Sequence, residues 1–173
     1  GGRCDRGLFG RRQKGGEVRG ESGRTAVDGF LVVFDLEEEV SAALDALNRV
    51  DFVYVHVEAP DETSHEGKLD LKLRAIEDFD KRVVAPCLEY ALKRGDVRIV
   101  VAPDHITALS TKTHAGGPVP FAMFGRGVIP DASIAYSEPD AAKTGLVFPR
   151  GYELVPAMIE SPVVNAAELL ESR

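Results

Sequence analysis

Five side chains of this sequence belong to the types that bind metal ions in proteins. They are Asp61, His65, Asp104, His105 and His114. Aspartate carboxylates and neutral imidazoles are the usual oxygen and nitrogen ligands of zinc, manganese and related divalent ions. The chain has four histidines in all, so three of them belong to this set. The chemistry that these residue types predict is therefore metal binding.

The spacing of the five residues favours a site for two ions. Asp61 and His65 are four residues apart, so one turn of the chain can direct both at one ion. Asp104 and His105 are adjacent, which suits a turn at the end of a strand better than a regular strand. Five ligands are too many for one tetrahedral ion but form most of a two-metal site. Such sites stabilise the attacking and leaving oxygens of phosphoryl transfer.

Alternating strand and helix patterns must position these residues. Short apolar runs predict strands at 30–34, 51–59, 98–102 and 119–124, the second ended by Pro60. Apolar residues at intervals of three and four predict helices over 37–49, 68–94 and 152–159, with a last helical turn at 166–170. Asp35 is expected to cap the first of these helices. The second is expected to be kinked or split at Pro86 and to end at Gly95. This alternation predicts an α/β fold with a mainly parallel sheet flanked by helices.

The ligand candidates follow the expected strands along the chain. Segments 60–65 and 103–105 each come directly after a strand, and segment 112–118 comes before the last one. Because active groups of parallel α/β sheets gather beyond the carboxyl ends of the strands, we expect these segments to lie together.

Each of these residues also has a structural interpretation. An Asp–His pair in a loop is most often a solvated turn. Thr63, Ser64 and Glu66 fit the start of the next helix, and Glu58 fits either strand-end support or an outer role at a metal site. A hydrogen-bonded position in the core is expected for His56, a surface position for Lys112 and a small apolar core position for Cys87.

Composition excludes several classes of protein. The 173 residues are 44% hydrophobic and 28% charged, which indicates a globular domain without a transmembrane run. The net charge of −7 argues against binding nucleic acid or anionic membranes. Residues 1–29 hold 9 of the 17 glycines and 7 of the 21 basic residues, so we expect a basic leader that is loop or disordered. Residues 30–173 then carry −10 and form the folded part. Two cysteines predict a reducing, cytoplasmic location.

Three segments carry a resemblance to a known family. VHVEAPDETSHEG, IVVAPDH and KTHAGGPVPFAMFG are similar, in this order, to the cofactor-independent phosphoglycerate mutases of the archaeal type. The resemblance runs from about Asp51 to Glu160 and matches the C-terminal part of those enzymes. It implies a partial α/β/α sandwich of the alkaline phosphatase superfamily, and an enzyme that interconverts 3-phosphoglycerate and 2-phosphoglycerate.

The resemblance also implies how the ligands divide between two divalent ions, manganese, magnesium or zinc. Asp61, His65 and His114 would hold one ion, and Asp104 and His105 the second. In the family an N-terminal aspartate and a nucleophilic serine complete the second ion, and the serine carries the phosphoryl group between the two positions of phosphoglycerate. A metal lowers the pKa of such a serine and neutralises the phosphoryl oxygens.

The sequence departs from the family at that N-terminal aspartate and serine motif. Neither motif is present, and Ser22, Ser64 and Ser110 do not fit the nucleophile. We therefore expect the metal-binding half of a mutase that is inactive alone, with an exposed edge or apolar face that promotes self-association. A related metal-dependent phosphatase or phosphomutase, and a non-catalytic metal-binding fragment, are the alternatives.

Overall fold

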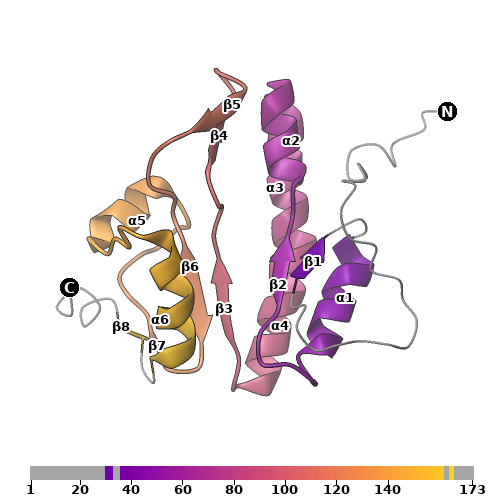
Figure 1. Ribbon diagram of the computed structural model, residues 1–173, viewed down its shortest axis with the longest axis vertical. Coiled ribbons are helices and arrows are strands. Elements are labelled where there is room, and N and C mark those ends of the chain that lie inside the picture. Colours follow the sequence, from indigo (N-terminus) through magenta and orange to yellow (C-terminus); the bar gives the residue numbers. More distant parts are fainter. Residues whose placement is uncertain (1–29, 33–35, 162–163, 166–173) are drawn as a thin grey trace. The chain divides into compact units, whose positions relative to one another are not determined.

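The computed structural model describes residues 30–32, 36–161 and 164–165. These residues divide into two units, each described here by itself (Figure 1). The first unit holds the described residues up to 87 together with 107–113, and the second holds 88–106 and the described residues from 114 onward. The predicted leader (1–29), the Asp35 cap and the helical turn at 166–170 lie outside the described residues.

A small parallel sheet and a helix form one part of the first unit. Strand β1 (Phe30–Val32) pairs with β2 (Tyr54–His56) in parallel, and the helix α1 (Leu36–Ala46) connects them. A core cluster contains the buried residues Leu36, Val40 and Val83, with Leu44, Val55, Val57, Phe79 and Cys87 packed against it. The predicted strand at 30–34, the helix after it and the core position of Cys87 are confirmed where the structure describes them.

The segment 51–66 differs from its prediction. Strand β2 ends at His56, and α2 (Ala59–Glu66) begins where the strand was expected to stop. Pro60 lies in the first turn of this helix, because the missing amide proton of proline has no partner to lose there. Tyr54 is exposed and the rest of β2 is half-buried, although the apolar run there is typical of a buried strand. Asp61 and His65 consequently lie on a helix and not in a loop.

The long predicted helix at 68–94 consists of three consecutive helical parts. They are α3 (Leu69–Phe79), the π-helical segment η1 (Asp80–Val84) and α4 (Ala85–Arg94). α2 and α3 lie side by side (Figure 1). The change from π-helix to α-helix falls just before Pro86, where the sequence predicted a kink or a split, and the backbone stays helical across it. Gly95 has φ +71° and its amide donates to the Ala91 carbonyl, so the predicted glycine end of the helix is confirmed.

Short strands and helices make up the rest of the described chain. They are β3 (Arg98–Val101), β4 (Ile106–Ala108), β5 (Thr113–Ala115), β6 (Ala122–Gly125), β7 (Val128–Ile129), α5 (Glu138–Thr144), the 3-10 segment η2 (Gly151–Glu153), α6 (Leu154–Glu160) and β8 (Val164–Asn165). β4 and β5 form a hairpin through a turn at residues 109–112, which the sequence patterns did not predict, and β7 pairs with β8 in parallel. The helix predicted at 152–159 is confirmed as η2 and α6.

The fold is mixed α/β, but the prediction of a mainly parallel sheet is wrong in the second unit. β3 and β6 pair antiparallel, with Ile99 opposite Phe124 (Figure 1). Parallel pairing needs a crossover of a dozen or more residues, usually a helix. The chain between β3 and β6 contains the hairpin and no helix, so it returns in the opposite direction. Each strand in the described residues pairs with one other strand, and no sandwich is seen there.

No helix in the described part of the chain combines the length and the apolar character needed to cross a membrane.

Candidate metal centre

Helix α2 brings Asp61 and His65 together in the first unit. The two residues are one helical turn apart, so their side chains leave the same face of the helix. His65 Nε2 lies 3.4 Å from Asp61 Oδ2. Asp61 also lies in the first turn of α2, where the helix dipole stabilises a carboxylate. The two side chains therefore lie next to each other, as their spacing of four residues suggests.

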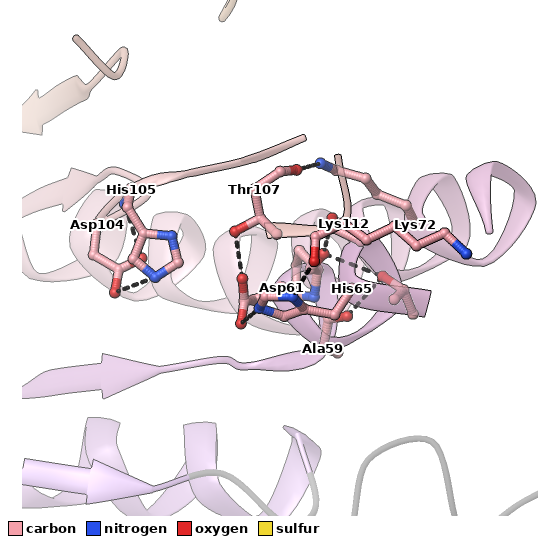
Figure 2. Close-up of polar contacts among 11 residues, drawn as sticks. Ala59, Asp61, His65, Lys72, Asp104, His105, Thr107 and Lys112 are labelled. Atoms are coloured by element: carbon pink, nitrogen blue, oxygen red, sulfur yellow. Dashed lines mark hydrogen bonds and ion pairs between the residues drawn. The ribbon is translucent and has the colours of Figure 1, made fainter. Parts of the chain in front are cut away.

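A backbone carbonyl determines which nitrogen of His65 carries its proton. His65 Nδ1 lies 2.8 Å from the Lys112 carbonyl oxygen (Figure 2). A carbonyl only accepts hydrogen bonds, so Nδ1 must donate. The neutral imidazole therefore presents its lone pair at Nε2, toward Asp61. Metal-binding histidines in other proteins are held in the same way, with the second ring nitrogen donating to a carbonyl or carboxylate.

The pair formed by His65 Nε2 and Asp61 Oδ2 fits a cation. Both atoms are electron-pair donors when the imidazole is neutral, so they repel unless a proton or a metal ion lies between them. Two ligand atoms about 2.1 Å from a tetrahedral ion lie about 3.4 Å apart. The observed separation of 3.4 Å agrees with this value. The donor set of the first unit therefore fits a divalent ion.

The second unit gathers the other three predicted ligands. Asp104 and His105 lie in a turn directly before β4, as expected from their adjacency, and His105 Nε2 lies 3.5 Å from Asp104 Oδ2 (Figure 2). Asp104 Oδ1 also accepts a hydrogen bond from the His105 amide at 3.0 Å. His114 lies on β5, and its ring centre is 3.8 Å from that of His105. Imidazoles and a carboxylate are the ligand types that divalent ions take in proteins.

The structure shows the positions of Thr63, Ser64 and His56, for which the sequence suggested structural roles. Thr63 and Ser64 lie inside α2 and not at the start of a helix, and their hydroxyls donate to the Ala59 and Pro60 carbonyls. The capping prediction for them is therefore wrong, because Pro60 begins the helix earlier. Ser64 is 0% exposed, which excludes it as a nucleophile for an external substrate in this conformation. His56 is half-buried, 3.4 Å from the Tyr54 hydroxyl.

The sequence did not predict Thr107. This residue is 6% exposed and its hydroxyl donates to Asp61 Oδ1 (Figure 2). Its carbonyl accepts a hydrogen bond of 2.9 Å from Lys72 Nζ on α3. No spacing rule connects positions 61, 72 and 107, and only the fold of the first unit brings them together. A buried threonine next to a candidate ligand has no signature in the sequence.

Comparison with known proteins identifies the family. A family model described as the metalloenzyme superfamily matches residues 22–146, which is more than half of the chain. This chain belongs to the metalloenzyme superfamily. All five predicted ligands lie inside the range that the family model matches.

The relatives of this metalloenzyme-superfamily chain include phosphoglycerate mutases. It is 48% identical over 125 residues to a probable 2,3-bisphosphoglycerate-independent phosphoglycerate mutase of Geobacter sulfurreducens, covering 72% of this chain and 31% of that protein. It is 43% identical over 122 residues to the corresponding enzyme of Methanothrix thermoacetophila, covering 70% and 31%. The chain thus spans about a third of the length of these relatives.

A solved structure is similar in fold. The PH0037 protein of Pyrococcus horikoshii matches with a TM-score of 0.65 and 32% sequence identity, over 73% of this chain and 38% of that one. The resemblance to archaeal-type phosphoglycerate mutases that the sequence motifs indicated is confirmed.

Proposed function

We propose that this chain supplies the metal-binding part of a cofactor-independent phosphoglycerate mutase, which interconverts 3-phosphoglycerate and 2-phosphoglycerate. The observation that carries the proposal is the pair of donor sets on a chain that is 48% identical to such an enzyme over 125 residues.

Two ions divide the ligands in this proposal. Asp61, His65 and His114 hold one, and Asp104 and His105 hold the other. A bound divalent ion supplies positive charge that neutralises phosphoryl oxygens and lowers the pKa of a hydroxyl nucleophile. The chain itself orients the ligands: the Lys112 carbonyl holds the His65 ring, and the His105 amide holds the Asp104 carboxylate.

The resemblance to phosphoglycerate mutases is the reason for assigning all five ligands to one centre with two ions.

Metal titration tests the proposal. Calorimetry with Mn²⁺ or Zn²⁺ should show binding to the wild-type chain, and His114→Ala should weaken it by at least tenfold, since a ligand is lost. His56→Ala is the matched control, because His56 is a histidine outside both donor sets and should leave the affinity unchanged. Equal affinities for wild type and His114→Ala would refute the ligand assignment.

The same chain should not interconvert phosphoglycerates alone. No serine in the sequence fits the nucleophile of the family, so a coupled assay for 2-phosphoglycerate should give no signal above background. Turnover by the purified chain, free of other mutases, would contradict this expectation.

A second candidate function is that of a related metal-dependent phosphatase or phosphomutase. The family that matches the chain is a superfamily of metalloenzymes, wider than a single activity. Hydrolysis of a general phosphomonoester, lost on adding a chelator, would favour this alternative over both the mutase and a non-catalytic metal-binding role.

A further inference from the structure

Beyond the ligands, the first unit holds a buried side chain that hydrogen-bonds to Asp61. Thr107 is buried, at 6% exposed, between α3 and α2. Its hydroxyl donates to Asp61 Oδ1, while Asp61 Oδ2 faces His65 Nε2 at 3.4 Å. The two oxygens of the carboxylate therefore have different roles: Oδ1 accepts a hydrogen bond from the protein, and Oδ2 remains next to the other ligand atom.

A hydrogen bond to one carboxylate oxygen limits rotation of the whole group. A free aspartate can rotate about χ2 and present either oxygen, in many orientations. With Oδ1 held by a buried hydroxyl, Oδ2 has one orientation before any ion binds. Ligands that are held in place in this way bind metal more tightly, because less freedom is lost on binding, and removing such support typically costs about 10–100-fold in affinity.

The hydroxyl is itself held by contacts of the backbone. Lys72 Nζ on α3 donates to the Thr107 carbonyl at 2.9 Å, which attaches the β4–β5 hairpin to the helix beside α2 (Figure 2). At the other end of the hairpin turn, the Lys112 amide donates to the Ala108 carbonyl at 2.8 Å, and the Lys112 carbonyl accepts from His65 Nδ1. The tip of one hairpin therefore supports both ligands of α2, Asp61 through a side chain and His65 through a carbonyl.

We propose that Thr107 is a positioning residue of the metal centre, which sets the orientation of the Asp61 carboxylate through its hydroxyl. This inference rests on the proposed metal-binding function. It adds to the metal centre a residue that is not one of the five proposed ligands. Thr107 would act through Asp61 and not as a ligand itself, so its contribution should appear in metal affinity even where the fold is unchanged.

The test compares Mn²⁺ affinity in matched variants, measured from the electron paramagnetic resonance signal of free Mn²⁺. Thr107→Val removes the hydroxyl but keeps the shape, and should weaken binding by about 10–100-fold. Thr107→Ser keeps the hydroxyl and should restore most of the affinity. Thr63→Val is the control, because Thr63 is also buried, at 3% exposed, but its hydroxyl contacts backbone carbonyls only. Its affinity should equal that of the wild type.

A double-mutant cycle shows whether Thr107 acts through Asp61. In an Asp61→Ala background, Thr107→Val should cause no further loss of affinity, because the carboxylate it orients is gone. Urea unfolding of each variant without metal shows whether a loss of affinity is only a loss of fold. Wild-type affinity in Thr107→Val, or an equal loss in Thr63→Val, would overturn the inference and leave the metal site intact. A wild-type chain that binds no Mn²⁺ would overturn the proposed function, and the inference with it.

Discussion

The environment of Tyr136 raises the pKa of its hydroxyl. Its hydroxyl donates to the Pro120 carbonyl at 3.2 Å. Partial burial, with a smaller contribution from the charge of Glu138, raises the pKa of Tyr136 from its ordinary value of 10.0 to about 12. A group with a raised pKa in the folded state contributes stability below its unfolded pKa, and this contribution is lost as the pH rises through the folded pKa. The relevant window is therefore pH 10 to 12.

Ultraviolet titration of the phenolate signal checks this prediction. The wild-type chain should contain one phenol that ionises near pH 12 and is absent from Tyr136→Phe. Urea unfolding should also show that the free energy of unfolding falls more steeply between pH 10 and 12 in the wild type than in this variant. Parallel curves for the two proteins would contradict the prediction.

The proximity of two candidate ligands was predictable, and the contacts that support them were not. Asp61 and His65 carry a signal in the sequence, because a spacing of four residues places two side chains on one face of a helix. Thr107 carries none, because its partner is 46 positions away and their contact depends on how a hairpin packs in the first unit. Local spacing indicates which groups meet within an element, whereas contacts between elements require the fold.

Gly125 ends strand β6 in a conformation that favours glycine. Its φ is +122°, and a Cβ atom there would meet the Val97 carbonyl and the backbone of Arg98 on the paired strand. We expect Gly125→Ala to lower the free energy of unfolding by about 1–3 kcal/mol, measured by urea denaturation. Gly151→Ala is the control, because nothing lies within reach of a Cβ atom at that position, and its change should stay within about 0.5 kcal/mol. Equal stabilities of the two variants would refute the role of Gly125.

At the level of elements, periodicity predicted the longer helices well, missed α2 and α5, and did not indicate the pairing direction of the strands. The intervals of three and four residues predicted α1 and the α3–α4 segment with nearly correct ends. The sequence predicts that a strand ends at Pro60 because proline interrupts strands. Proline also fits the first turn of a helix, and the structure has this second arrangement. The direction of β6 against β3 depends on the path of the chain between them, which apolar patterns do not record.

At the level of the whole molecule, exposed apolar residues on α3 predict self-association. Leu69, Leu73 and Ile76 are spaced as one stripe of a helix and are 58%, 52% and 45% exposed. A row of apolar side chains in water favours contact with a second copy of the chain. Sedimentation velocity at increasing protein concentration should therefore show faster-sedimenting species.

Leu73→Glu should remove or reduce this association, since it introduces a charge in the middle of the stripe. Leu92→Glu is the control, because Leu92 is 64% exposed on α4 and lies outside the stripe. A wild-type chain that stays monomeric at the highest concentration would contradict the prediction.

The π-helical segment η1 explains why that stripe is exposed. A π turn holds more residues than an α turn, so each π-helical residue turns the chain by a smaller angle about the helix axis. After the five residues of η1, the side chains point about 90–100° away from where a continuous α-helix would place them. On a plain helical wheel, Leu69, Leu73, Ile76 and Val83 would share one face. With the phase shift, Val83 and Cys87 instead line up with Ala75 and Phe79 toward the core, and the earlier leucines are out of phase with them. Removing one residue of η1, such as the exposed Lys81, would restore the plain phase and turn Cys87 away from the core.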